Sequence, residues 1–368
     1  MAGASVAVAD EGTAVWTNPA GLARDERLDI QVFGGGLATN RNGFTAALDR
    51  LSSLNLDRIR QGQDLSRIPR AIEDLRTLAS PGTGVVGSGV AGLVVGKGGI
   101  AIGIGDVVYG SVFPTVDLVR VQPGGNEATG LAFNRSGLSF LGLEAREARV
   151  SYARGFYKKT LLVGGTVRYI QGRTYFLRRG VFETEESDPA ELLREAFEEN
   201  ARETARVTFD AGAMLNLLGK VRIGLVATAI NEPEFEVARV PEAPAVVRLP
   251  RTARLGVAVQ PIGMLTVAAD LDLEESDTLT RDENGAPGKS RQLSGGAELK
   301  LPLFAIRAGA FRDLSAPDPH WAYAVGFGLG LKILSVNAAA VFSSEGGLSL
   351  SSTNRRDVGA ALDARFRF

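Results

Sequence analysis

Apolar residues alternate strictly with polar or small residues along at least seven stretches of this chain. Successive side chains of a β-strand point to opposite faces, so a period of two gives a strand with one apolar face. The stretch 207–217 is typical: its odd positions are all apolar, while its even positions include Thr208 and Asp210. This pattern predicts an all-β chain in which most strands have one apolar face.

Marking every alternating segment gives fourteen predicted strands. Many of them are about ten to thirteen residues long, whereas a tilted strand that spans a membrane needs about nine to eleven and an ordinary strand has about five or six. The predicted strands are 28–37, 86–96, 99–109, 143–157, 160–176, 205–217, 219–230, 250–260, 262–273, 290–301, 303–312, 321–331, 333–343 and 356–368. Their length and even number favour an antiparallel transmembrane β-barrel of about fourteen strands over a soluble sandwich.

The connections between these strands alternate in length, six short turns with seven longer loops. Outer-membrane barrels have this asymmetry, with short periplasmic turns and long extracellular loops, so both termini are predicted to be periplasmic. The loop at about 45–79 carries leucines and isoleucines mostly three or four residues apart, which predicts two short amphipathic helices. A second helix is predicted at about 188–204, with Pro189 at its first position. We expect apolar side chains of these extracellular helices to capture a hydrophobic ligand.

Composition excludes several kinds of chemistry. The chain has no cysteine and one histidine, His320. Thiol catalysis and Cys/His zinc sites need cysteines that the chain lacks, and a Ser-His-Asp triad would depend on its single histidine. We therefore expect no enzyme, no metal and no cofactor. Composition alone leaves a carboxylate-only enzyme open. The net charge of −1 gives no argument for a nucleic-acid partner.

The sequence also bears on export. No run of eighteen apolar residues occurs, so no transmembrane helix is predicted. Residues Met1 to Ser5 lack a basic region followed by an apolar core, so we expect no signal peptide in this sequence. Because the strand pattern indicates export, we expect the export signal to be absent from the given sequence and the protein to lie in the bacterial outer membrane.

Three local patterns have both a functional and a structural interpretation. Gly87 to Gly92 matches the dinucleotide pattern G-x-G-x-x-G, but it lies inside an alternating strand, which favours glycines packed in a barrel wall. The acidic residues between Asp272 and Glu283 could bind a divalent cation, but they lack the spacing of an EF-hand, which favours a solvated loop. His320, next to Trp321, is predicted to be a membrane-interface residue.

The last predicted strand ends in Arg365-Phe366-Arg367-Phe368. An alternating C-terminal strand that ends in phenylalanine resembles the signal by which the outer-membrane assembly machinery recognises its clients. We therefore expect Phe366 and Phe368 to act as an assembly signal.

The N-terminal stretch carries a more specific resemblance. Residues 2–22 include Ala9-Asp10-Glu11 and the triplet Asn18-Pro19-Ala20. This stretch resembles the hatch segment of the long-chain fatty-acid transporter superfamily of outer-membrane β-barrels. The resemblance implies a hatch or plug at 1–27, gated at Asn18, Pro19 and Ala20, followed by a barrel at 28–368. The alternative interpretation of Pro19 is an ordinary turn proline in an exposed N-terminal arm.

Within that superfamily, the sequence from Ala14 to Leu22 and the Leu54-Asn55-Leu56 triplet are most similar to the plasmid-transfer or conjugal-transfer branch. We expect an outer-membrane channel for hydrophobic small molecules such as long-chain fatty acids, with hatch or lateral gating and no covalent chemistry. The ligand, or a lipid or detergent, would lie in the lumen. The alternative is a non-conducting structural or interaction barrel that contacts components of a conjugation or secretion apparatus.

Overall fold

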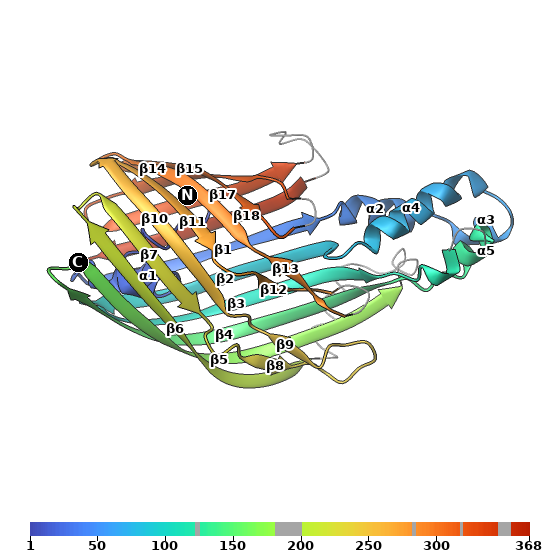
Figure 1. Ribbon diagram of the computed structural model, residues 1–368, viewed down its shortest axis with the longest axis horizontal. Helices are drawn as coiled ribbons and strands as arrows, with labels where there is room; N and C mark the ends of the chain where they lie inside the picture. Colours follow the sequence, from blue (N-terminus) through green and yellow to red (C-terminus); the bar gives the residue numbers. More distant parts are fainter. Residues whose placement is uncertain (122–125, 181–200, 282–284, 317–318, 345–354) are drawn as a thin grey trace.

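The computed structural model describes residues 1–121, 126–180, 201–281, 285–316, 319–344 and 355–368. Fourteen strands form one closed barrel, in which every neighbouring pair is antiparallel (Figure 1). The barrel strands are β1 (Asp29–Arg41), β2 (Gly84–Lys97), β3 (Ile100–Thr115), β4 (Gly137–Phe156), β5 (Leu161–Gly180), β6 (Arg202–Leu217), β7 (Val221–Thr228), β10 (Thr252–Ile262), β11 (Leu265–Asp272), β14 (Gln292–Lys300), β15 (Phe304–Asp313), β16 (Ala322–Gly330), β17 (Leu334–Ser344) and β18 (Arg355–Arg367). The predicted fold class and strand number are confirmed.

The barrel closes where the first strand pairs with the last. The register of β1 with β18 runs from Asp29 opposite Arg367 to Thr39 opposite Asp357. Just beyond it, the backbone N–H groups of Leu28 and Phe368 each donate to the carbonyl oxygen of the other, at 3.1 and 2.9 Å. The C-terminus lies at the barrel end that carries the short turns, here called the turn end, whereas Met1 lies further inside the barrel, against Gly296 and Gly309. The opposite end is called the loop end.

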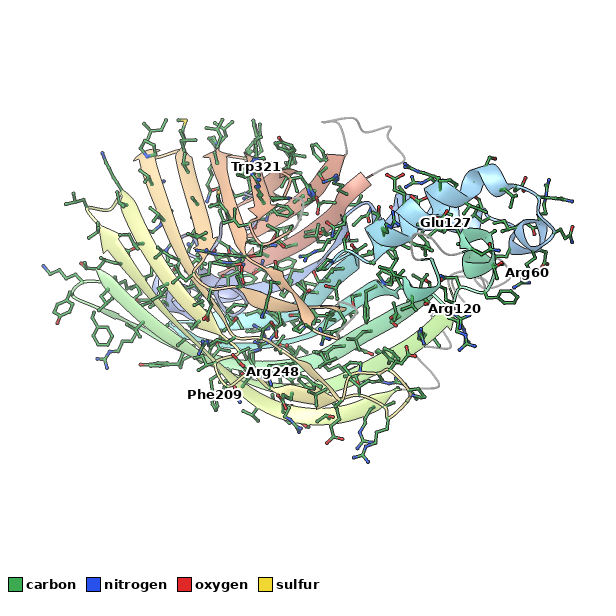
Figure 2. The ribbon with its side chains drawn as sticks, turned by 45° about the vertical axis from the view of Figure 1, so that its right-hand side comes forward. Arg60, Arg120, Glu127, Phe209, Arg248 and Trp321 are labelled. Atoms are coloured by element: carbon green, nitrogen blue, oxygen red, sulfur yellow. The ribbon has the colours of Figure 1, made fainter. Side chains whose placement is uncertain are left out.

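The apolar register of the strands faces outward. On β11, Val267 is 45% exposed whereas its neighbour Ala268 is 3% exposed. Val207, Phe209, Val325 and other apolar members of the alternating segments are also exposed, and Figure 2 shows Phe209 and Trp321 among the side chains of the barrel wall. The inner face carries small, polar and charged residues together with apolar residues that pack against the N-terminal segment and the loop-end hairpins. The predicted alternation therefore corresponds to outside and inside of the barrel.

Several strands are longer than predicted, and β4 and β5 form the longest pair. The prediction placed strands at 143–157 and 160–176, whereas β4 begins at Gly137 and β5 ends at Gly180. Their pairing continues in register up to Gly137 opposite Gly180. The periodicity is weak near Gly137 and Gly142, so the sequence alone did not indicate this extension. The barrel wall is consequently taller along β3 to β6 than along most of the other strands.

A group of short helices, here called the helical head, extends from the loop end (Figure 1). Residues Arg60, Arg120 and Glu127 belong to it and lie far from Phe209 in Figure 2. The head consists of α2 (Phe44–Ser52), α3 (Leu56–Arg60), η2 (Leu65–Arg67), α4 (Ile68–Leu78), η3 (Val119–Val121) and α5 (Glu127–Ala132). The loop at 45–79 thus holds three α-helices and one 3-10 turn rather than two helices.

The apolar side chains of the helical head form a core of their own. Leu51, Leu75 and Leu131 are fully buried there, although Leu131 comes from a different loop. The guanidinium of Arg50 binds the buried carboxylate of Asp74 at 2.6 Å, and this hydrogen bond raises the pKa of Arg50. The head packs most of these apolar side chains into its own core, and ligand capture by the helices stays a prediction.

No helix in the described part of the chain is both long and apolar enough to cross a membrane. Of the second predicted helical segment, 188–204, residues 188–200 lie outside the described residues. Its last residues, from Arg202 on, are the start of β6, so the prediction of helix is wrong there.

Two hairpins from the loop end were not predicted. One consists of β8 (Glu234–Glu236) and β9 (Val246–Arg248), the other of β12 (Ser276–Arg281) and β13 (Pro287–Ser290). Phe235 of the first is fully buried against inward residues of β3, β4 and β5, and a Cβ at Gly172 of β5 would lie 2.3 Å from its ring. The second hairpin contacts β2, β3 and β4. The first hairpin therefore folds into the lumen, and the second lies against β2, β3 and β4 at the loop end.

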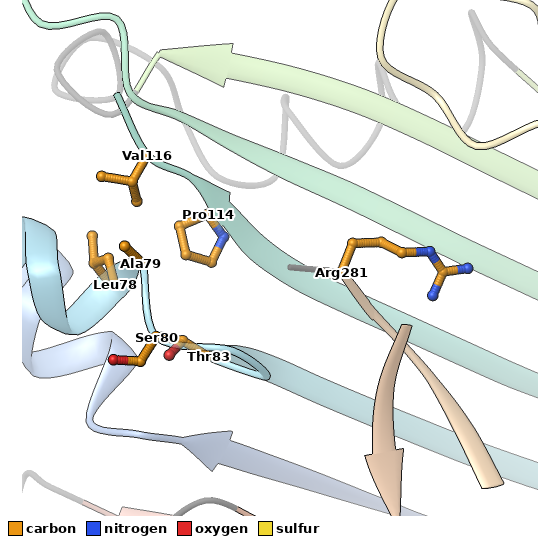
Figure 3. A pocket seen from close by; sticks show the side chains of 7 residues that line it. All are labelled: Leu78, Ala79, Ser80, Thr83, Pro114, Val116 and Arg281. Carbon is orange, nitrogen blue, oxygen red and sulfur yellow. The ribbon is translucent and has the colours of Figure 1, made fainter. Parts of the chain in front are cut away.

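Figure 3 shows the point where the second hairpin meets the helical head. A cavity of about 10 Å³ lies there between the end of α4, the end of β3 and Arg281. This is the volume of roughly one water molecule. It is a packing defect rather than a ligand site.

The N-terminal segment, residues 1–27, lies inside the barrel at the turn end. It contains α1 (Glu11–Ala14) and η1 (Pro19–Ala23), which contact β1, β2, β4, β5 and β6. Ala7, Ala14 and Ala20 are fully buried. Small side chains allow the segment to approach the wall closely, and its detailed contacts define the candidate site.

Candidate functional site

Asn18, Pro19 and Ala20 form a fully enclosed corner in the N-terminal segment. The Asn18 side chain is 0% exposed and its Oδ1 accepts from the backbone N–H of Ala20 at 3.2 Å, which caps η1. Its Nδ2 lies 3.0 Å from the carbonyl oxygen of Val6 and 3.3 Å from that of Ala213 on β6. Pro19 at the first helical position lacks an N–H that would otherwise need a partner. Asn18 thus ties the corner both to the segment and to the wall.

Two glycines of the wall receive this corner. Gly164 of β5 and Gly212 of β6 are direct cross-strand partners. A Cβ at Gly164 would lie 2.6 Å from the carbonyl carbon of Pro19, and a Cβ at Gly212 would lie 2.0 Å from Asn18 Oδ1. Real Cβ atoms do not approach other atoms so closely, so only glycine fits at both positions. We call this pair the glycine cradle.

A buried group of four charges lies on the inner wall of β4, β5 and β6. Glu147 binds Arg149 at 2.6 Å and Arg168 at 2.7 Å, and Arg168 also lies 3.3 Å from Asp210. All four side chains are at most 7% exposed, and the two positive and two negative charges balance. Pairing of this kind is required because an unpaired buried charge is strongly destabilising.

Arg149 connects this charge group to the N-terminal segment. Its Nη1 donates to the carbonyl oxygen of Val15 at 3.1 Å, and its guanidinium lies 3.6 Å from the ring centroid of Trp16. Trp16 also meets Phe33 of β1 edge to face, at 5.2 Å between centroids. The sequence analysis did not predict these contacts of Arg149 and Trp16. The signal was present as charged residues at every second, inward position of an apolar strand, namely Glu147 and Arg149.

Other contacts hold the first residues of the segment. The carboxylate of Asp270 on β11 accepts from the backbone N–H groups of Ser5 at 2.7 Å and Val6 at 2.9 Å. Arg222 of β7 donates to the carbonyl oxygen of Ala7 at 3.0 Å. The segment is therefore bound by hydrogen bonds to strands on a wide arc of the barrel.

The segment also touches both strands of the closure. Gly12 donates its N–H to Asp29 of β1 at 2.7 Å, and Asp10 lies 3.4 Å from Arg365 of β18. Burial alone would raise the pKa of Asp10, but the positive charges of Arg365 and Arg24 outweigh it and hold this pKa below its usual value. Asp10 is enclosed by the barrel, yet its side chain stays 41% exposed because it faces an internal cavity.

This luminal cavity has a volume of about 900 Å³ and lies between the N-terminal segment and the wall formed by β14 to β18 and β1. Part of its wall nearer the turn end is polar: Arg307 binds Glu298 at 2.6 Å and Asn337 at 2.9 Å, and Asn337 donates to Asp363 at 3.1 Å. Toward the loop end the lining is mostly apolar. The apolar residues there are Trp16, Phe33, Leu37, Phe311 and Val341.

The other sequence patterns do not form a site. Gly87 to Gly92 lies within β2, in line with the structural interpretation. Among the described residues no group of three potential metal ligands comes together. In the acidic stretch, Asp272 binds Arg254 at 2.5 Å and Glu274 binds Arg251 at 3.0 Å, while Asp282 and Glu283 lie outside the described residues.

His320 differs from its prediction as an interface residue, because its Nε2 lies 2.6 Å from the buried carboxylate of Asp357. Phe366 and Phe368 are 40% and 61% exposed on the outside of the barrel, at the turn end. Both rings are therefore accessible to another protein, and their role as an assembly signal stays a prediction.

Comparison with known proteins adds a family. The model of the family described as F plasmid transfer operon, TraF, protein matches residues 15–272, more than half of the chain. The chain belongs to this family. The match begins just before the Asn18 corner and ends at Asp272, the last residue of β11. No curated protein matches this TraF family member.

Solved structures share the fold of this TraF family member at low sequence identity. A Pseudomonas aeruginosa FadL homologue is 12% identical, with a TM-score of 0.53, covering 100% of this chain and 96% of that one. The Ralstonia pickettii toluene transporter TbuX is 12% identical, with a TM-score of 0.53 and coverages of 99% and 97%. CymD, a monoaromatic hydrocarbon channel, is 13% identical, with a TM-score of 0.51 and coverages of 99% and 94%. These likenesses show the barrel fold.

Proposed function

We propose that this protein is an outer-membrane channel that binds and passes hydrophobic small molecules. The luminal cavity carries the proposal: at about 900 Å³ it lies within the range of about 300–1,000 Å³ of small-molecule sites, and its loop-side lining is mostly apolar. The outward apolar register supports a membrane location, because lipid can cover a face that water would disfavour. The structural relatives named as toluene and hydrocarbon channels are consistent with such cargo.

The N-terminal segment acts as the hatch in this proposal, with Asn18, Pro19 and Ala20 as its fixed corner. A barrel with many strands leaves a lumen that has to be blocked if the membrane is to remain a barrier. The segment occupies the turn end and its corner is bonded to β6. Passage of a ligand then requires the segment to move. Phe366 and Phe368 serve as the assembly signal, and no covalent chemistry is involved.

Ligand binding can be measured through Trp16, which lines the cavity. The chain has two tryptophans, so the variant Trp321→Phe leaves Trp16 as the sole reporter. We expect toluene or a long-chain fatty acid to change its fluorescence saturably. Phe311→Arg, which places a charge in the apolar half, should abolish the change. Saturation that is unaffected by Phe311→Arg would exclude this cavity as the site.

Deletion of residues 2–17 tests the hatch separately. We expect liposomes containing the deleted form to leak small solutes faster, while the barrel keeps its heat-resistant mobility on gels. Unchanged leakage from an intact barrel would show that the segment is not the plug.

The family description favours one second candidate, a structural or interaction barrel of a conjugation apparatus that conducts nothing. The helical head, which has its own core and extends from the loop end, would then be the part that contacts other components. Two results together would favour this candidate over the channel. Removal of the head should abolish plasmid transfer, and the complete protein should show no ligand binding at Trp16.

A further inference from the structure

A layer of polar side chains lies directly beyond the apolar end of the luminal cavity. On β1, β15 and β17 the lining residues nearest the loop end are Leu37, Phe311 and Val341. Because side chains alternate, the next inward positions are two residues further on. These positions are occupied by Thr39, Asp313 and Ser343, and all three form hydrogen bonds in this layer.

One ion pair in this layer connects distant parts of the wall. Arg41 of β1 reaches Asp313 of β15, with 2.7 Å between Nη2 and Oδ2, and their side chains are 9% and 18% exposed. Three strands, β18, β17 and β16, separate β1 from β15 in the barrel. With about 4.8 Å between adjacent strands, these two side chains meet across the lumen rather than along the wall.

A second hydrogen-bonded group fills the same layer beside this ion pair. The carboxylate of Asp357, 2% exposed, accepts from Thr39 at 2.8 Å and from Ser343 at 2.5 Å, and it lies 2.6 Å from His320 Nε2. Arg41 also donates to the carbonyl oxygen of Lys289, in the hairpin formed by β12 and β13, at 3.2 Å. Wall and hairpin are thus joined above the cavity.

We propose that the ion pair between Arg41 and Asp313 is a loop-side gate of the luminal cavity. The pair lies just beyond the apolar end of the cavity, and in the proposal its separation opens a route from the cavity to the loop end. The proposal rests on the proposed channel function only in assuming that ligands use this route. Arg41 suits a part that has to move, because its buried Nε has no hydrogen-bond partner and the closed arrangement is incompletely satisfied.

The gate can be tested without any ligand, because the chain contains no cysteine. In Val341→Cys, the introduced thiol lies just below the gate and is the only one in the protein. Its reaction with a small, charged thiol reagent is measured from outside on cells that lack general porins. These cells deny the reagent an alternative route to the turn end.

In this background we expect Arg41→Ala and Asp313→Ala each to raise the labelling rate about tenfold or more, since a tenfold shift needs only about 1.4 kcal/mol and breaking a buried pair removes more than that. The double variant should be no faster than the quicker single variant. Arg41→Met, which keeps most of the side-chain volume without the charge, should also be faster and serves if an alanine variant fails to fold.

Arg251→Ala is the matched control. Arg251 pairs with Glu274 at the loop end at 3.0 Å, but the two residues adjoin neighbouring strands, so this pair crosses no lumen. We expect no change in the rate. Equal labelling of the parent, Arg41→Met and Asp313→Ala in barrels of normal heat-resistant mobility would overturn the gate, as would an equal rise in Arg251→Ala. Faster labelling without any ligand binding at Trp16 would support the gate and count against the proposed cargo instead.

Discussion

Replacing Gly164 by alanine should loosen the N-terminal segment from the wall. The added Cβ would lie 2.6 Å from the carbonyl carbon of Pro19, whereas an ordinary contact begins at 3.4 Å. The Asn18 corner therefore has to move by about 0.8 Å, the difference between these two distances. Overpacking of this kind costs about 1–3 kcal/mol. At a factor of ten per 1.4 kcal/mol, the population of the displaced segment should rise about 5-fold to 150-fold.

Gly165→Ala provides a closely matched control. Gly165 is the next residue on β5 and faces outward, where a Cβ would meet only one atom, the Asp210 carbonyl oxygen at 3.5 Å. Both substitutions change the flexibility of the unfolded strand in the same way, so this contribution cancels between them. The difference between the two variants isolates the contact with the corner.

The displacement can be followed by solute leakage from liposomes and by quenching of Trp16 fluorescence in the Trp321→Phe background. We expect faster leakage and greater access of a soluble quencher in Gly164→Ala, with Gly165→Ala like the parent. If Gly164→Ala and Gly165→Ala behave alike in both assays, the corner is not held by the glycine cradle.

Two further outcomes follow from the structure. Arg149→Leu leaves Glu147 with one partner fewer and removes the donor to the Val15 carbonyl oxygen, so thermal or denaturant unfolding should show a free energy of unfolding lower by about 3–5 kcal/mol. The control Arg146→Leu, on the exposed face, should change it by no more than about 0.5 kcal/mol. A small loss for Arg149→Leu would mean that the charge group does not stabilise the fold. Phe368→Ser should lower the amount of protein in the outer membrane of cells without changing the unfolding temperature of the purified barrel, because the side chain is 61% exposed, and normal accumulation would contradict an assembly signal.

The barrel could be predicted from the sequence because its main determinant is local. Alternation within a strand, as at Val267 and Ala268, decides which face is apolar, and a strand long enough to span a membrane leaves many repeats of the pattern. The hairpin that carries Phe235 gave no such signal, because its strands have only three residues each and its burial depends on Gly172 of a distant strand. Short elements that are stabilised by tertiary contacts escape a periodicity analysis.

The site was predictable only in part, for a related reason. The Asn18-Pro19-Ala20 triplet stood out as a motif, but its cradle consists of Gly164 and Gly212, two ordinary glycines in a chain with 45. The pair formed by Arg41 and Asp313 joins residues whose meeting depends on the circumference of the barrel. Nothing in the residues near either of them indicates the other.

The contacts of the N-terminal segment at the barrel closure also bear on how the chain folds. The first and last strands are separated by almost the whole sequence, so β1 keeps an unpaired edge until β18 arrives, and such edges favour aggregation. Gly12 binds Asp29 on one side of this seam, and Asp10 lies against Arg365 on the other. A slip of one residue would turn Arg365 outward and break its contact with Asp10. The segment that fills the lumen can thereby act as an internal template, which selects the correct register when the barrel closes around it.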